Sequence, residues 1–194
     1  MAFINPIDEC SDFTINESTI EDIQEAFTLN KLTSRQLIDF YLHRIKVLNP
    51  ILGAVLEVNP DAQDQADKAD CERREDQDRS MLHEIPVLLK DSIATFDKLN
   101  TTSGSYALLG SKVPHDAHVV SKLRDAGAII IGKTSLPEWY EIHSSKMLGQ
   151  AWCSRGGFGL VSSTHHYHSL LLCFFFFEAS YYVSKILLFL VILY

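Results

Sequence analysis

The chain has 194 residues and a formal net charge of −8, a length that suits one domain with a sizeable core. The charge is uneven, because residues 1–80 hold 8 Lys and Arg against 17 Asp and Glu, whereas residues 81–194 hold 9 against 8. An acidic N-terminal half argues against a nucleic-acid partner, since capture of a phosphate backbone requires clustered Lys and Arg.

Two amphipathic helices are predicted near the N-terminus. Ser18 and Glu21 have the spacing of a capping box, which predicts the start of the first helix, and Thr33 with Gln36 repeats the pattern for the second. Apolar residues then recur at helical spacing in the second segment. Asn49–Pro50 should end this helix, because a residue that precedes proline is disfavoured in the helical conformation.

A short strand and a polar helix are expected next. Residues 54–58 form the strand, and Asn59–Pro60 breaks it. Residues 61–80 favour a helix whose alanines at positions 62, 66 and 69 give only a narrow packing stripe. We therefore expect this helix to lie on the surface, where its many carboxylates are solvated.

The most informative stretch predicts a β-α-β unit. Residues 85–89 are almost wholly apolar and indicate a buried strand that ends in Lys90. Residues 116–126 favour a helix, Gly127 should stop it, and residues 128–131 form a second apolar strand. This order favours an α/β domain with a parallel pair in its sheet. A further short helix is expected to start at residues 136–139.

No cofactor or metal site is expected from the sequence. His165, His166 and His168 form a cluster, but it lies in a low-complexity segment with no carboxylate nearby, so an incidental cluster is the preferred interpretation. Residues 132–134 imitate the end of a phosphate-binding loop, but residues 128–131 before them form a strand, so we reject that site. The four cysteines have neither metal-ligand nor redox-motif spacing, and the N-terminus lacks a secretion signal, so a cytoplasmic location is the default.

The segment 160–194 differs from the rest of the chain. Its only charges are Glu178 and Lys185, and it shows neither a helical nor a strand period. Residues 169–194 are long enough to cross a bilayer and would place the chain at a membrane if they insert, although each charge would cost ~2.5–3.5 kcal/mol at mid-membrane. The residue types that dominate it (Phe, Leu, Ser, Tyr, Ile, Val, His and Cys) can all be written with thymine-rich codons, so translation of a retained intron is the preferred origin. We predict a partial domain over 1–159 and an apolar tail over 160–194.

A set of segments resembles the amidase signature family. Residues 85–92 resemble that family's catalytic-lysine segment, and four later segments agree with it in order and spacing, over residues 102–105, 114–116, 123–128 and 131–134. Residues 152–157 resemble its tryptophan-serine-x-arginine-glycine-glycine segment. The resemblance covers roughly residues 18–157, and the whole is similar to a plant or fungal type of amidase.

The resemblance implies the N-terminal part of a fold in which helices surround a mixed sheet, here incomplete. It also implies hydrolysis of a small carboxylic amide by a nucleophilic serine, a second serine that relays the proton, and a lysine. Lys90 matches the lysine. Burial of such an amine would lower its pKa toward the working pH, so that it could accept a proton and activate a serine.

The chain departs from the family after Arg155–Gly157, where the family continues into a glycine- and serine-rich stretch with the relay serine. Ser162–Ser163 lacks flanking glycines, and Ser103–Ser105 matches the segment just after the lysine instead. We therefore expect an amidase-family fragment that lacks both catalytic serines and is inactive alone. The alternatives are a non-catalytic truncated isoform and a tail-anchored membrane protein.

Overall fold

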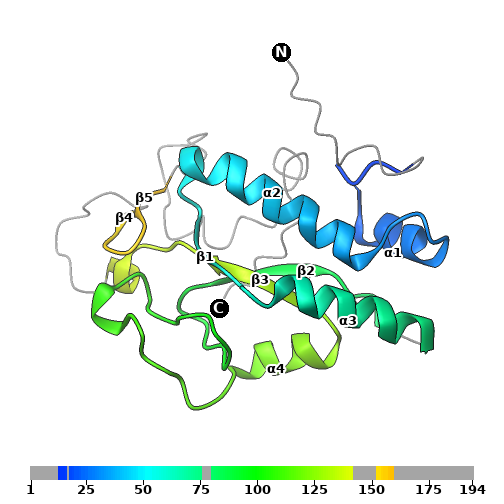
Figure 1. The fold of residues 1–194 in the computed structure, drawn as a ribbon. Helices are drawn as coiled ribbons and strands as arrows, with labels where there is room; N and C mark the ends of the chain where they lie inside the picture. The colour runs from blue at the N-terminus through cyan, green and yellow to red at the C-terminus, as the bar shows by residue number, and fades with distance from the viewer. Residues whose placement is uncertain (1–12, 17, 76–79, 142–151, 160–194) are drawn as a thin grey trace.

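The computed structural model describes residues 13–16, 18–75, 80–141 and 152–159 (Figure 1). The described α-helices are α1 (Ile20–Thr28), α2 (Ser34–Leu52), α3 (Ala62–Glu75) and α4 (His118–Asp125). The main strands are β1 (Val55–Val58), β2 (Pro86–Lys90) and β3 (Ile129–Thr134). Two 3₁₀ helices, η1 (Tyr106–Leu108) and η2 (Glu138–Glu141), and a small hairpin of β4 (Trp152–Cys153) and β5 (Gly157–Phe158) complete the described part.

The three main strands form a mixed sheet in the order β1-β3-β2. Strands β2 and β3 are parallel and are joined through α4, which confirms the predicted β-α-β unit. Strand β1 lies antiparallel on the other side of β3, with Glu57 opposite Lys133. The prediction of an α/β fold with a mixed sheet is thus confirmed for the described residues.

Helices cover both faces of this sheet (Figure 1). Alternate strand residues point to opposite faces, as the period of two in a β-strand requires. Leu88 and Ile131 join the core beneath α1, α2 and α3, whereas Val87, Leu89 and Ile130 join a second core beneath α4. Residues 86–89 of β2 and 129–131 of β3 are consequently all apolar, which explains the continuous apolar runs in the sequence.

The helix starts are partly as predicted. Thr33 and Gln36 form the expected capping box of α2. The prediction for α1 is wrong by one residue, because Thr19 and Asp22 form its capping box in place of Ser18 and Glu21. The hydroxyl of Ser18 is buried and donates to the carbonyl of Thr14 at 2.6 Å, so it is not available to cap α1.

The predicted end of α2 is also wrong, because the helix runs through Pro50 to Leu52. Gly53 ends it in the left-handed conformation (φ +59°) and donates its N–H to the carbonyl of Asn49 at 2.8 Å. The side-chain amide of Asn49 also bonds both the N–H and the carbonyl of Val55 at 2.8 Å each. These bonds hold the last turn in place and outweigh the local preference of a residue before proline.

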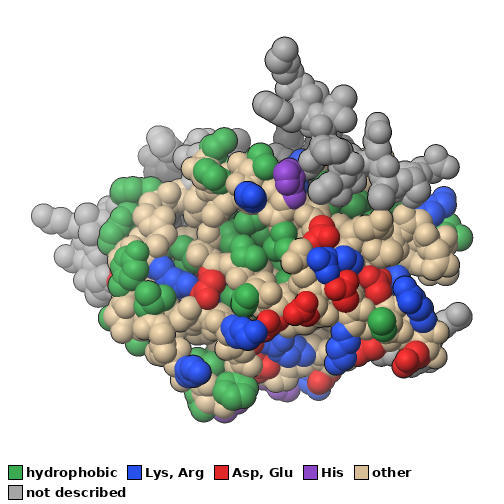
Figure 2. Space-filling model, viewed as in Figure 1, with side chains coloured by type: hydrophobic (Ala, Val, Ile, Leu, Met, Phe, Trp, Pro, Cys, Tyr) green, Lys and Arg blue, Asp and Glu red, His purple; other side chains and the backbone are tan. Residues whose placement is uncertain are grey.

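Helix α3 is a surface helix, as predicted. Its alanines at positions 62, 66 and 69 are buried against the core, and Figure 2 shows acidic and basic side chains together over its outer face. Asp70 also caps a neighbouring helix, since its carboxylate accepts the N–H groups of Ser34 (2.8 Å) and Arg35 (3.1 Å) at the start of α2. The outer face of α3 carries charges of both signs, and its carboxylates account for only part of the acidity of the N-terminal half.

Gly127, the predicted helix stop, follows α4 with φ +80°. A Cβ at this position would lie 2.0 Å from Nδ1 of the buried His83. Gly127→Ala should therefore lower the free energy of unfolding by about 1–2 kcal/mol through the left-handed backbone alone, and further through displacement of the ring. Urea unfolding followed by circular dichroism measures this loss.

Gly110 is the matched control for this substitution. It has the same φ of +80°, but a Cβ there meets nothing within 4 Å. Gly110→Ala should cost only the conformational part, so that the difference between the two variants reports the clash with His83. Equal losses for the two would contradict this account.

Several predictions lie outside the described residues. They include the histidine cluster, Glu178 and Lys185, the serines at 162 and 163, and the boundary between residues 159 and 160. Within the described ranges, no helix is both long enough and apolar enough to cross a membrane.

Candidate active site

The carboxyl ends of β2 and β3 lie at one edge of the sheet, next to the hairpin of β4 and β5 (Figure 1). Lys90 is the last residue of β2 and pairs in register with Thr134, the last residue of β3. Ligand sites in α/β proteins lie characteristically outside the carboxyl ends of parallel strands. A functional site is therefore expected at this edge.

Lys90 lies at the end of its strand, as predicted, and its Nζ donates to the main-chain carbonyl of Ser135 at 2.9 Å. Its side chain is half-buried. The strand itself is buried, but its last residue reaches the rim of the sheet. A half-buried ammonium held by a carbonyl has a fixed position and remains within reach of a ligand.

The fully buried lysine of this site is Lys133, which sequence reasoning missed. Its Nζ donates to the carbonyl of Ile93 at 2.5 Å and to the hydroxyl of Thr101 at 3.1 Å, and so joins both ends of the loop that follows β2. Burial lowers the pKa of Lys133 to about 8, although the negative charges of Asp91 and Glu57 oppose this shift. The strand runs on to Thr134, beyond its predicted end at residue 131, so the apolar pattern did not place Lys133 within the sheet.

Asp91 is completely buried and organises the same loop. Its carboxylate accepts the N–H of Gly104 at 2.9 Å and the hydroxyl of Thr102. Its main-chain carbonyl accepts the N–H groups of Thr102 (3.0 Å) and Ser103 (3.2 Å). Asp91 therefore folds residues 91–104 back onto the sheet.

Arg155 joins this loop to β1. Its guanidinium donates to Oδ1 of Asp91 at 2.9 Å and to a carboxylate oxygen of Glu57, and its side chain is only 9% exposed. Glu57 also accepts the N–H and the side-chain amide of Asn100. Partial burial raises the pKa of Glu57, but the hydrogen bonds from Arg155 and Asn100 outweigh this effect, so that its pKa lies below the usual value.

Cys153 connects the hairpin to the residue that holds Lys90. Its thiol is buried, lies 3.6 Å from the hydroxyl of Ser135 and accepts the N–H of Gly156 at 3.2 Å. Two serines nearby have structural roles. The hydroxyl of Ser154 donates to the carbonyl of Gly104 at 3.1 Å, and that of Ser105 accepts the N–H of Ala107 at the start of η1.

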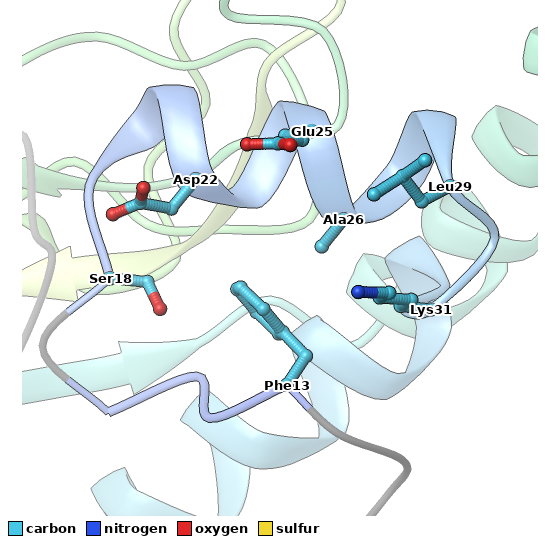
Figure 3. Close-up of a pocket in the computed structure, with 7 residues that line it drawn as sticks. All are labelled: Phe13, Ser18, Asp22, Glu25, Ala26, Leu29 and Lys31. Carbon is cyan, nitrogen blue, oxygen red and sulfur yellow. The ribbon is translucent and has the colours of Figure 1, made fainter.

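A separate hollow of about 210 Å³ lies beside α1, at the other end of the sheet (Figures 1 and 3). Two of its polar side chains already serve local structure, because Asp22 completes a capping box and Ser18 donates to a carbonyl. The hollow is lined by Phe13, Ser18, Asp22, Glu25, Ala26, Leu29 and Lys31. Within the described part of the chain, no three potential metal ligands lie close enough together to hold an ion.

Comparisons with known proteins agree on one family. The family model described as Amidase matches residues 36–150. A protein described as a probable amidase from Arabidopsis thaliana is 55% identical over 148 residues, which cover 75% of this chain and 29% of that protein.

Solved structures give the same result. The peptide amidase of Stenotrophomonas maltophilia has a TM-score of 0.68 and 42% identity, over 74% of this chain and 29% of that one. An amidase family protein from Bacillus anthracis has a TM-score of 0.70 and 29% identity, over 79% and 30%. The chain therefore spans less than a third of the length of these relatives.

Proposed function

Because the chain belongs to the Amidase family, we propose that it forms the N-terminal part of an amide hydrolase in which Lys90 is the catalytic base. The position of Lys90 carries this proposal. It lies at the carboxyl end of a parallel strand, with its amine fixed by the carbonyl of Ser135 and its side chain only half-buried. The proposed substrate is a small carboxylic amide.

The chemistry requires a serine that this lysine can activate. An amine in its neutral form accepts a proton from a serine hydroxyl, which then attacks the amide carbon. Neither the nucleophile nor the relay serine can be assigned among residues 1–194 by the family's pattern. Lys90 is thus the one member of the proposed catalytic group that this chain supplies.

We expect the 194-residue chain, purified alone, to hydrolyse amides no faster than background. A base without its nucleophile has nothing to activate, and removal of one member of a catalytic group loses most of what the group provides. The test is a panel of aliphatic and aromatic amides assayed with the wild-type chain and with Lys90→Ala. The exposed Lys112 provides the control substitution, Lys112→Ala.

One outcome of this assay would contradict the expected inactivity, and a longer product of the same locus provides a second test. Turnover by the wild type that disappears in Lys90→Ala but persists in Lys112→Ala would overturn the expected inactivity and would indicate a serine within these residues. A longer product of the same locus that continues past Gly157 into a glycine- and serine-rich stretch should be active. In that product, Lys90→Ala should lower kcat by about 10²–10⁴-fold, and unchanged activity would reject the role of Lys90.

The same proposal includes a boundary between residues 159 and 160, which separates the amidase part of the chain from the apolar segment. Residues 1–159 belong to the amidase domain, and residues 160–194 form an apolar segment of separate origin. Sequencing the transcript across the codons for residues 156–160 tests this division. A clean exon junction followed by the codons of the segment would contradict an intron origin.

A further inference from the structure

We propose that Arg155 is a positioning residue for Lys90 and acts through Cys153 and Ser135. This inference rests on the role proposed for Lys90, and it concerns how the structure holds the amine in place. Three steps carry it, from the guanidinium of Arg155 to the amine of Lys90.

In the first step, the guanidinium is fixed between carboxylates from two different parts of the sheet. Glu57 belongs to β1, and Asp91 directly follows β2. Asp91 is fully buried, and the side chain of Arg155 is nearly so, so these ion pairs are shielded from solvent. A planar guanidinium that donates to two carboxylates has its orientation fixed as well as its position.

In the second step, this anchor holds the hairpin against the loop that follows β2. The N–H of Arg155 and the hydroxyl of Ser154 both donate to the carbonyl of Gly104, at 3.0 and 3.1 Å. The contact is so close that a Cβ on Gly104 would lie 2.7 Å from Cβ of Cys153. Glycine at 104 therefore permits the hairpin to lie directly on the loop.

In the third step, the anchored hairpin meets the residue that holds the amine. The thiol of Cys153 lies 3.6 Å from the hydroxyl of Ser135, and the carbonyl of Ser135 accepts the Nζ of Lys90 at 2.9 Å. The N–H of Ser135 donates to the carbonyl of Ala54 at 2.8 Å. Ser135 is thus held from the β1 side by Ala54 and from the hairpin side by Cys153, and loss of the anchor frees one of these sides.

The test measures how fast the amine of Lys90 reacts. The full chain and the variants Arg155→Gln and Arg155→Lys are treated with a water-soluble acetylating reagent, and modification of each lysine is followed by mass spectrometry. Lys68, with a side chain that is 77% exposed, provides the internal reference. Acetylation of Lys90 relative to Lys68 should rise several-fold in Arg155→Gln and by less in Arg155→Lys, which retains one charge.

Arg124 offers a matched control, because its guanidinium also pairs with two carboxylates, those of Asp97 and Asp116. Arg124→Gln should leave the acetylation of Lys90 relative to Lys68 unchanged. A general loss of stability would instead raise this relative rate in both Arg155→Gln and Arg124→Gln. If Arg155→Gln does not fold, Glu57→Gln removes one of the two carboxylates and should still raise the rate.

An unchanged rate at Lys90 in a folded Arg155→Gln or Glu57→Gln chain would overturn the inference. So would an equal rise in Arg124→Gln. The acetylation rates do not depend on amide hydrolysis, so failure of the inference about Arg155 is distinguishable from failure of the proposed function. The latter would appear as full activity of a Lys90→Ala variant in a longer product, with the acetylation rates unaffected.

Discussion

Replacement of Asp91 with alanine is expected to lower the free energy of unfolding by about 3–5 kcal/mol, because it leaves a nearly buried guanidinium without one of its two counter-charges. The substitution also removes the acceptor for the N–H of Gly104 and the hydroxyl of Thr102, both of which are buried. Unpaired buried donors add to the loss. Urea unfolding followed by circular dichroism measures the change.

The control for this substitution is Asp125→Ala, at the exposed end of α4. A surface carboxylate should contribute no more than about 0.5 kcal/mol. A loss below about 1 kcal/mol in Asp91→Ala, on the scale of such surface substitutions, would show that water replaces the missing carboxylate. The loop 91–104 would then be held by its main-chain bonds.

The stability of the chain should rise by about 3 kcal/mol between pH 8 and pH 10.5 because of Lys133. The pKa of this lysine is about 8 in the folded chain and 10.5 without burial. Below pH 8, folding bears the full cost of a buried ammonium. Above pH 8 the folded chain loses this proton while the unfolded chain retains it, so the cost declines until both have lost it. Urea midpoints measured across this range provide the test.

Two variants separate Lys133 from other groups that titrate in the same range. Lys133→Met has no proton to lose at this position, so the difference in unfolding free energy between wild type and variant should vary with pH by the predicted amount. Lys122→Met, at an exposed position of α4, provides the control for removal of a lysine elsewhere in the chain. Parallel curves for the wild type and Lys133→Met would contradict the shifted pKa.

Local patterns in the sequence predict much of the fold. The capping box of Thr33, the apolar runs of β2 and β3, and Gly127 as a helix stop are signals within a few residues of one another, and each is confirmed. The mistakes also have local causes. Two capping patterns overlap at the start of α1, and the bonds of Asn49 hold a proline inside the last turn of α2.

The candidate site was only partly predictable, because its contacts join distant parts of the chain. The position of Lys90 at a strand end follows from the apolar run before it. The partners of Arg155 lie 64 and 98 residues away in the sequence, and no local pattern relates them. The sequence position of Lys133 likewise does not reveal that its amine donates hydrogen bonds to the carbonyl of Ile93 and the hydroxyl of Thr101.

The separation between Arg155 and its carboxylates has a consequence for synthesis of the chain. Glu57 leaves the ribosome 98 residues ahead of Arg155, which at ~5–20 residues per second is a delay of ~5–20 s. Strands β2 and β3 are made during this delay, and β3 ends at Thr134, still ahead of Arg155. Once all three strands exist they can pair, but until Arg155 is made the two carboxylates at the edge of the sheet have no guanidinium to neutralise them. Asn100 and the loop after β2 can already donate to them, but the guanidinium is still missing, so this edge of the nascent domain is completed only when the hairpin has been made.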